Sequence, residues 1–268
     1  MNDRTDPYEE RRAPNGLYYR VTGRGAPLLL LHGLMASGAT FDSLVELLRN
    51  DFHLLIPDLR GHGQSGGMSG PYDVGVLAGD LDVVMAEAGF ARANVLGYSH
   101  GGAVAQVLAR ARLQAVAKLF LVCTYACNVA TLREYLEGVA SVSLLSVVSP
   151  RTVARLMLRL GSSSMPGMTA EKAARMTDII GANDRQKMRA AAKGLIAFDS
   201  RPWLKDISVP TLVIAGAQDA GVPAHHFMAL MFGIPGALGT VVRGAGHTLL
   251  WTHTEELAGL IRKHGVRN

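Results

Sequence analysis

The sequence has few of the features that mark secreted, membrane-spanning or disulfide-stabilised proteins. Only two cysteines occur in 268 residues, Cys123 and Cys127. Their spacing matches no zinc or redox motif, so we expect reduced packing residues. The longest apolar runs, such as PLLLLHGLM, are far shorter than the roughly 20 residues that cross a bilayer. The first residues, MNDRTDPYEERRAP, lack the apolar stretch of a secretion signal. These absences predict a cytoplasmic protein with no membrane partner.

The charge pattern is basic but holds no block of Lys and Arg and no aromatic–basic RNA motif, so we expect no nucleic-acid partner. The net charge of +5 is confined to one segment. Residues 128–204 contain 11 basic and 6 acidic residues, whereas the rest of the chain contains 16 of each. Two interpretations stay open: a solvated helical face, or a positive field that favours an acidic or carrier-linked acyl substrate.

Short β-rich runs alternate with helical patterns over the first 125 residues. This alternation predicts a mostly parallel sheet that helices cover on both faces. The run at 26–33 is almost continuously apolar, as a strand buried on both faces requires, and the strand at 16–23 is expected to be antiparallel. The remaining strands are expected at 52–61, 94–99 and 116–125, and the helices at 40–50, 72–89 and 101–112.

From about residue 128 the pattern becomes helical, with four periodic segments and no strand. Strand patterns return at 209–219 and 239–247, and an amphipathic helix follows at 253–265. We therefore predict an α/β core of residues 1–127 and 205–268, interrupted by an all-helical lid of residues 128–204. Five methionines of this insertion fill either its own core or a deformable acyl pocket: Met157, Met165, Met168, Met176 and Met188.

The stretch LGYSHGG places Gly97 and Gly101 on either side of Ser99, between a predicted strand and a predicted helix. This is the sequence form of a nucleophile elbow, a sharp strained turn that exposes the serine. The residues two before and two after the serine pass close together in such a turn, so side chains there would prevent it. The alternative is an ordinary Ser/Gly turn that caps a helix.

A serine hydroxyl needs a general base, normally a histidine that a carboxylate orients, and in this arrangement the order is Ser, acid, His. His247 directly follows the last predicted strand, and Asp219 ends the strand before it. We predict His247 as base and Asp219 as acid. The weaker candidates lie at a strand start, in an early loop or on helices: His53, His62, His253, His264, Asp199, Asp206 and Glu255.

The tetrahedral oxyanion formed on acyl transfer needs backbone N–H donors. One donor is the amide after the nucleophile, which is His100. The other comes from the loop after an earlier strand, here HGLMASG, and we predict Leu34. No metal site is predicted, because the adjacent His225 and His226 have no further pair of ligands at suitable spacing nearby. They are expected at a partly exposed helix start.

The motifs LLLHGLMASG, IPDLRGHGQSG, LGYSHGG, IAGAQDAGVP and GAGHTLLW, in this order, resemble the α/β-hydrolase superfamily. The resemblance covers nearly everything outside the insertion. It implies the α/β-hydrolase fold with a helical lid, no cofactor, Ser99 as nucleophile, Asp219 and His247 as its partners, and Leu34 and His100 as oxyanion donors. A serine at the elbow argues against the haloalkane dehalogenases and epoxide hydrolases of the superfamily, which use an aspartate.

The favoured function is hydrolysis of ester, lactone or thioester bonds of small to medium acyl substrates through a Ser99 acyl-enzyme. Two other chemistries remain open, carbon–carbon bond hydrolysis and cofactor-free perhydrolysis, since they share these motifs. A ligand receptor built on the same fold is the non-enzymatic alternative.

Overall fold

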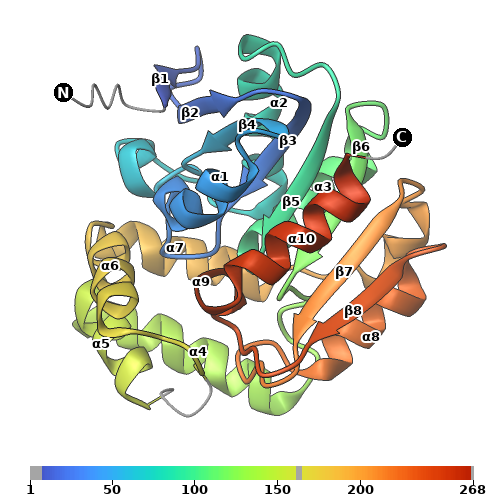
Figure 1. The fold of residues 1–268 in the computed structure, drawn as a ribbon. Coiled ribbons are helices and arrows are strands. Elements are labelled where there is room, and N and C mark those ends of the chain that lie inside the picture. Colours follow the sequence, from blue (N-terminus) through green and yellow to red (C-terminus); the bar gives the residue numbers. More distant parts are fainter. Residues whose placement is uncertain (1–7, 161–164, 267–268) are drawn as a thin grey trace.

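The computed structural model describes residues 8–160 and 165–266, and a single sheet crosses this part of the molecule (Figure 1). Its eight strands stand in the order β1-β2-β4-β3-β5-β6-β7-β8. Strands β3 to β8 are mutually parallel, and β2 pairs antiparallel with both β1 and β4. The strands are β1 (Glu9–Arg12), β2 (Tyr18–Gly23), β3 (Ala26–Leu31), β4 (Phe52–Pro57), β5 (Ala93–Tyr98), β6 (Val116–Val122), β7 (Thr211–Gly216) and β8 (Leu238–Val242).

Helices cover both faces of the sheet because its inner strands are apolar on both sides. In β3, Leu29 and Leu31 pack into the cluster beneath one face, and Leu28 and Leu30 into the cluster beneath the other. This alternation follows from the two-residue period of a strand. The first face carries α2 (Val74–Glu87), α3 (His100–Ala111) and α8 (Ala224–Gly233). The second carries α1 (Asp42–Leu48), α9 (Leu249–Thr252) and α10 (Thr254–Gly265), and α10 crosses the front of Figure 1.

Between β6 and β7 the described residues form helices and no named strand. The helices are α4 (Leu132–Val147), α5 (Pro150–Leu160), α6 (Ala170–Gly181) and α7 (Arg185–Ile196). We call them the helical segment. The side chains of Thr131, Thr169 and Asp184 accept hydrogen bonds from the first turns of α4, α6 and α7, as N-caps do. In Figure 1, α4, α5 and α6 group at one end of the molecule.

The predicted fold class is confirmed, with differences at the ends of elements, one unforeseen strand, and one helix of which only the start was expected. β1 is fully exposed and lies at the sheet edge, so it carries no alternation of apolar and polar residues. α8 is apolar almost throughout its length and shows little helical periodicity in its sequence. The predicted strand 239–247 ends at Val242, because the chain turns at Gly244 with a φ of 71°. Among the described residues, no helix is both long and apolar enough to cross a membrane.

The chain reverses its direction of travel across the sheet at β3, which has β4 on one side and β5 on the other. In open parallel sheets, ligands bind beyond the carboxyl ends of the strands at such a switch point. The loops that leave β3 and β5 carry His32–Leu34 and Ser99, so the topology brings these residues to one place.

Candidate active site

Ser99 lies on the turn between β5 and α3 in a conformation that side chains rarely adopt. Its φ is 53° and its ψ is −119°. A non-glycine residue in such a region costs about 1–3 kcal/mol, which the surroundings must offset. The Ser99 N–H donates to the carbonyl of Val122 at 2.9 Å, and the Thr124 hydroxyl donates to the Ser99 carbonyl at 2.7 Å. Strand β6 and the residues after it therefore hold the turn.

The two glycines around Ser99 allow a close approach of backbones. A Cβ on Gly97 would lie 2.4 Å from the carbonyl oxygen of Gly101. One on Gly101 would lie 2.1 Å from the carbonyl oxygen of Leu31 in β3. Both obstacles are main-chain atoms, which cannot swing away as a side chain can. The steric reason predicted for the GxSxG pattern thus holds.

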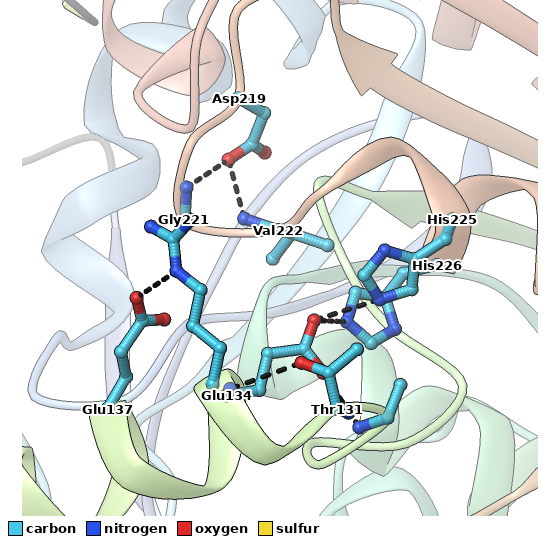
Figure 2. A network of polar contacts seen from close by, with 10 residues as sticks. Thr131, Glu134, Glu137, Asp219, Gly221, Val222, His225 and His226 are labelled. Atoms are coloured by element: carbon cyan, nitrogen blue, oxygen red, sulfur yellow. Dashed lines mark hydrogen bonds and ion pairs between the residues drawn. The ribbon is translucent and has the colours of Figure 1, made fainter.

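The structure brings Ser99, His247 and Asp219 into one hydrogen-bonded chain. His247 Nε2 lies 3.1 Å from Ser99 Oγ, and His247 Nδ1 lies 3.0 Å from Asp219 Oδ2. Asp219 Oδ1 accepts hydrogen bonds from the amides of Gly221 and Val222 at 2.9 and 2.8 Å (Figure 2). The loop after β7 therefore fixes the carboxylate, which in turn orients the imidazole.

Burial and charge act in opposite directions on His247. Burial lowers the pKa of the imidazole, but the charge of Asp219 and its hydrogen bond outweigh this, and the pKa lies above the ordinary value of 6.5. The Asp219 side chain is 3% exposed. The hydroxyl of Tyr98, on β5, donates to the His247 carbonyl at 2.7 Å and ties the His247 loop to the sheet.

Leu34 and His100 both line the cavity next to Ser99. Within the described part of the chain, neither N–H donates to a protein acceptor. His100 is the first residue of α3, where a helix leaves its amides unpaired. The imidazole of His32 fixes the start of the Leu34 loop. Its Nδ1 donates to the Gly33 carbonyl at 2.8 Å, and its Nε2 accepts from the Leu59 amide at 2.9 Å.

Asn183, after α6, connects the helical segment to the Leu34 loop. Its side-chain amide donates to the Met35 carbonyl at 2.8 Å, and its carbonyl accepts from the Gly63 amide at 3.0 Å. Asn183 is 7% exposed. Sequence reasoning missed this residue because nothing marks an isolated asparagine as special until its distant partners are known. His32 was also missed as a residue that positions the Leu34 loop, although it is the first residue of the stretch HGLMASG.

The His100 side chain is fully buried, and neither ring nitrogen has a hydrogen-bond partner among the described residues. Burial, and secondarily the neighbouring His62, lowers its pKa to about 3, so the ring is neutral at physiological pH. The His100 imidazole therefore contributes no charge to the site.

A cavity of about 440 Å³ opens beside Ser99, a size typical of small-molecule sites. The helical segment contributes much of its lining, including Met157 from α5 and Met176 from α6. Met165 also lines the cavity, whereas Met188 is fully buried in the segment's own core and Met168 packs beside a second small cluster. The methionines are therefore divided between the packed core of the helical segment and the lining of the cavity.

The interpretation of His225 and His226 needs one correction. They do lie in the first turn of α8, and His225 is exposed. His226, however, is buried, and a carboxylate stands beside both rings: Glu134, which α4 supplies from far away in the sequence. The sequence could not show this neighbour because spacing along the chain does not report contacts between α4 and α8.

The sheet, its switch point and the serine on the β5–α3 turn together define the α/β-hydrolase class of fold. A family model described as alpha/beta hydrolase fold matches residues 26–254, and the chain belongs to that family. The resemblance seen in the sequence is thereby confirmed.

Relatives that are named for an activity also match the chain along most of its length. It is 31% identical to a protein of Azorhizobium caulinodans named "Putative carbamate hydrolase RutD", over 82% of this chain and 84% of that protein. It is 28% identical to the pimeloyl-[acyl-carrier protein] methyl ester esterase of Neisseria meningitidis, over 87% and 90%. Among solved structures, a thermophilic esterase from Thermogutta terrifontis matches with a TM-score of 0.83 and 25% identity, over 96% and 97%.

Proposed function

We propose that this protein hydrolyses carboxylic esters, or the related lactone or thioester bonds, of small to medium acyl substrates through an acyl-enzyme on Ser99. The observation that carries the proposal is the continuous hydrogen-bonded chain from Ser99 through His247 to Asp219 at the edge of the cavity. The relatives named as hydrolases and esterases support the same class of reaction.

In the proposed first step, His247 Nε2 accepts the hydroxyl proton of Ser99 as Oγ attacks the acyl carbonyl carbon. Asp219 accepts the hydrogen bond from Nδ1–H and stabilises the imidazolium that forms. The carbonyl oxygen becomes an oxyanion, to which the amides of Leu34 and His100 donate. His247 then protonates the leaving oxygen or sulfur, the bond to the acyl carbon breaks, and the acyl group stays on Ser99.

The second half reverses these roles. A water molecule gives a proton to His247 and attacks the acyl carbon, and the same two amides stabilise the second oxyanion. Collapse of this intermediate returns the proton to Ser99 Oγ and releases the carboxylic acid. Neither half needs a cofactor.

We further propose that residues 128–204 act as the lid of this site. Residues of all four helices, such as Gly138, Met157, Ile179 and Leu195, border the cavity, which supports a role in enclosing the acyl group. The apolar side chains suit an apolar acyl chain. The core carries the reacting groups, and the helical segment would decide which acyl groups fit.

The basic excess of the helical segment supports a narrower proposal, that the acyl substrate is acidic or attached to an acidic carrier. Within residues 128–204, four arginines pair with carboxylates: Arg133, Arg151, Arg175 and Arg201. No ion pair is recorded in the described residues for Arg155, Arg185 or Arg189, which leaves them able to attract an acidic partner. Turnover of acidic acyl esters should fall with rising salt more steeply than turnover of neutral ones, and equal salt dependence would contradict this narrower proposal.

Labelling with a fluorophosphonate tests the central proposal. The adduct should map to the peptide that contains Ser99, and the Ser99→Ala variant should neither label nor turn over p-nitrophenyl esters. Labelling elsewhere, or undiminished turnover by Ser99→Ala, would refute the acyl-enzyme. A panel of esters, lactones and thioesters then identifies the bond that is cleaved.

Turnover measured on other substrates beside this panel separates the alternative functions. A carbon–carbon hydrolase would bleach a coloured ring-cleavage product faster than it cleaves any ester. A perhydrolase would form peracid from a carboxylic acid and hydrogen peroxide. A ligand receptor would label at Ser99 but show very slow turnover on every substrate.

A further inference from the structure

Three metal-ligating side chains from two distant parts of the chain meet at the rim of the cavity. Glu134 comes from the first turn of α4, and His225 and His226 come from the first turn of α8. His225 Nε2 lies 2.8 Å from Glu134 Oε1, and His226 Nε2 lies 3.2 Å from the same oxygen. Figure 2 shows both rings turned toward this carboxylate. The three ligand atoms all lie within 4.8 Å of one another.

The surroundings hold Glu134 and His226 in place. Glu134 Oε2 accepts hydrogen bonds from the amides of Ala130 and Thr131 at 2.7 and 3.0 Å, so Oε1 is left to face the histidines. The His226 side chain is 5% exposed and packs edge-on against Tyr125, with ring centroids 6.1 Å apart. Partners of this kind orient the ligands of metal sites.

The donor set is also one that divalent transition metals accept, because imidazole nitrogens and carboxylate oxygens are both ligands of Zn²⁺ in proteins.

The spacing fits a tetrahedral ion. Bonds of about 2.0–2.1 Å from Zn²⁺ to nitrogen and oxygen place the ligand atoms roughly 3.3 Å apart. Glu134 Oε1 lies 3.2 Å from His226 Nε2 and 2.8 Å from His225 Nε2, so the exposed His225 ring would move outward by about 0.5 Å to bind the ion. We propose that Glu134, His225 and His226 form a binding site for a divalent transition metal, of which Zn²⁺ is the type. Water or an anion takes the fourth position, as in other sites with three protein ligands.

A metal ion here links α4 to α8 beside the cavity, because Glu134 and His226 both belong to its lining. Without a metal, the two imidazoles share one carboxylate oxygen. The Nδ1 atom of His226 has no partner among the described residues. This atom stays unpaired whether or not a metal is bound, so it favours neither the metal-bound nor the metal-free protein.

Titration of the metal-free protein with Co²⁺, followed by visible absorption, tests the site. Competition with Zn²⁺ then gives the affinity of the site for Zn²⁺. We expect one Co²⁺ per chain with the intense bands of tetrahedral coordination. Glu134→Gln and His225→Ala should each weaken binding at least tenfold. His225 is 45% exposed at its side chain, so its loss leaves the fold intact. His225→Cys should restore binding and add a sulfur-to-cobalt charge-transfer band.

Two controls make the outcome decisive. His264→Ala, on the last turn of α10, should leave binding unchanged. The described residues hold one other group of this kind, Cys123, Asp219 and His247. If Asp219→Asn abolishes Co²⁺ binding and Glu134→Gln does not, the metal binds there and the proposal is wrong. Absence of any binding at stoichiometric Co²⁺ also overturns it. The readout needs no turnover, so it stays separate from the test of Ser99.

Discussion

Two buried histidines beside the candidate site should respond in opposite directions to the same substitution. His32 and His100 are both 0% exposed. Both nitrogens of His32 are hydrogen-bonded, whereas those of His100 have no partner in the described residues. A buried polar group without a partner costs about 1–3 kcal/mol. Methionine resembles histidine in length, adapts to irregular space and carries no strong hydrogen-bonding group.

The substitution His100→Met should therefore stabilise the protein by about 1–3 kcal/mol, because it removes two unpaired nitrogens from the interior. The substitution His32→Met should destabilise it by about 1–3 kcal/mol, because the Leu59 amide loses its acceptor. The Gly33 carbonyl loses less, since it also accepts from the Ala36 amide. The sign of the change thus depends on the hydrogen bonds and not on burial, which is equal.

Thermal unfolding of both variants measures the effect. For a chain of this size, 1 kcal/mol shifts the Tm by about 2–4 °C. Ester turnover by His100→Met should stay near that of the parent, because the proposed oxyanion donor is the main-chain amide. If His100→Met lowers the Tm as His32→Met does, the His100 imidazole has a hydrogen-bond partner in the folded protein. The expected gain in stability is then refuted.

Three further predictions concern the site itself. Asp219→Asn should reduce kcat on the order of 10⁴-fold, by analogy with serine proteases. The pH midpoint at which kcat/KM rises, which lies above 6.5 in the parent, should move lower, because burial then acts on the His247 pKa without the Asp219 charge. An unchanged midpoint would count against the pairing of Asp219 with His247. Gly101→Ala should prevent the turn, since its Cβ meets the Leu31 carbonyl at 2.1 Å, whereas the control Gly79→Ala on α2 meets nothing within 4 Å and should raise the Tm. Asn183→Ala should lower kcat about ten- to a hundredfold by freeing the Met35 carbonyl and the loop that carries Leu34; kinetics equal to the parent's would show that the loop holds without it.

The parts of the site that could be predicted lie on single loops with strong local constraints. The turn around Ser99 needs glycines at fixed offsets, and these are visible in LGYSHGG. Asp219 and His247 each follow a predicted strand, and the carboxyl ends of parallel strands meet at one edge of the sheet. Their order after Ser99 is the one that accompanies a nucleophile elbow. These features could be predicted because each depends on neighbours in the chain or on a general rule of the fold.

The parts that escaped prediction depend on contacts between distant elements. Asn183 acts on Met35 and Gly63, and Glu134 meets His225 and His226 only because α4 lies against the start of α8. In the sequence, His225 and His226 showed no nearby carboxylate. The sequence thus showed that no further metal-ligating side chains lie near these histidines along the chain. It did not show whether the fold brings one to them from elsewhere.

The sequence by itself determined the alternation of buried strands and helices and the strained serine turn, because periodicity and steric exclusion act between residues that are near in the chain. Only the tertiary structure decided that His247 Nε2 lies 3.1 Å from Ser99 Oγ, that a cavity of about 440 Å³ adjoins them, and that Glu134 faces two histidines. These distances arise where loops and helices that are far apart in the chain pack together, and such packing joins surfaces whose match no local pattern records.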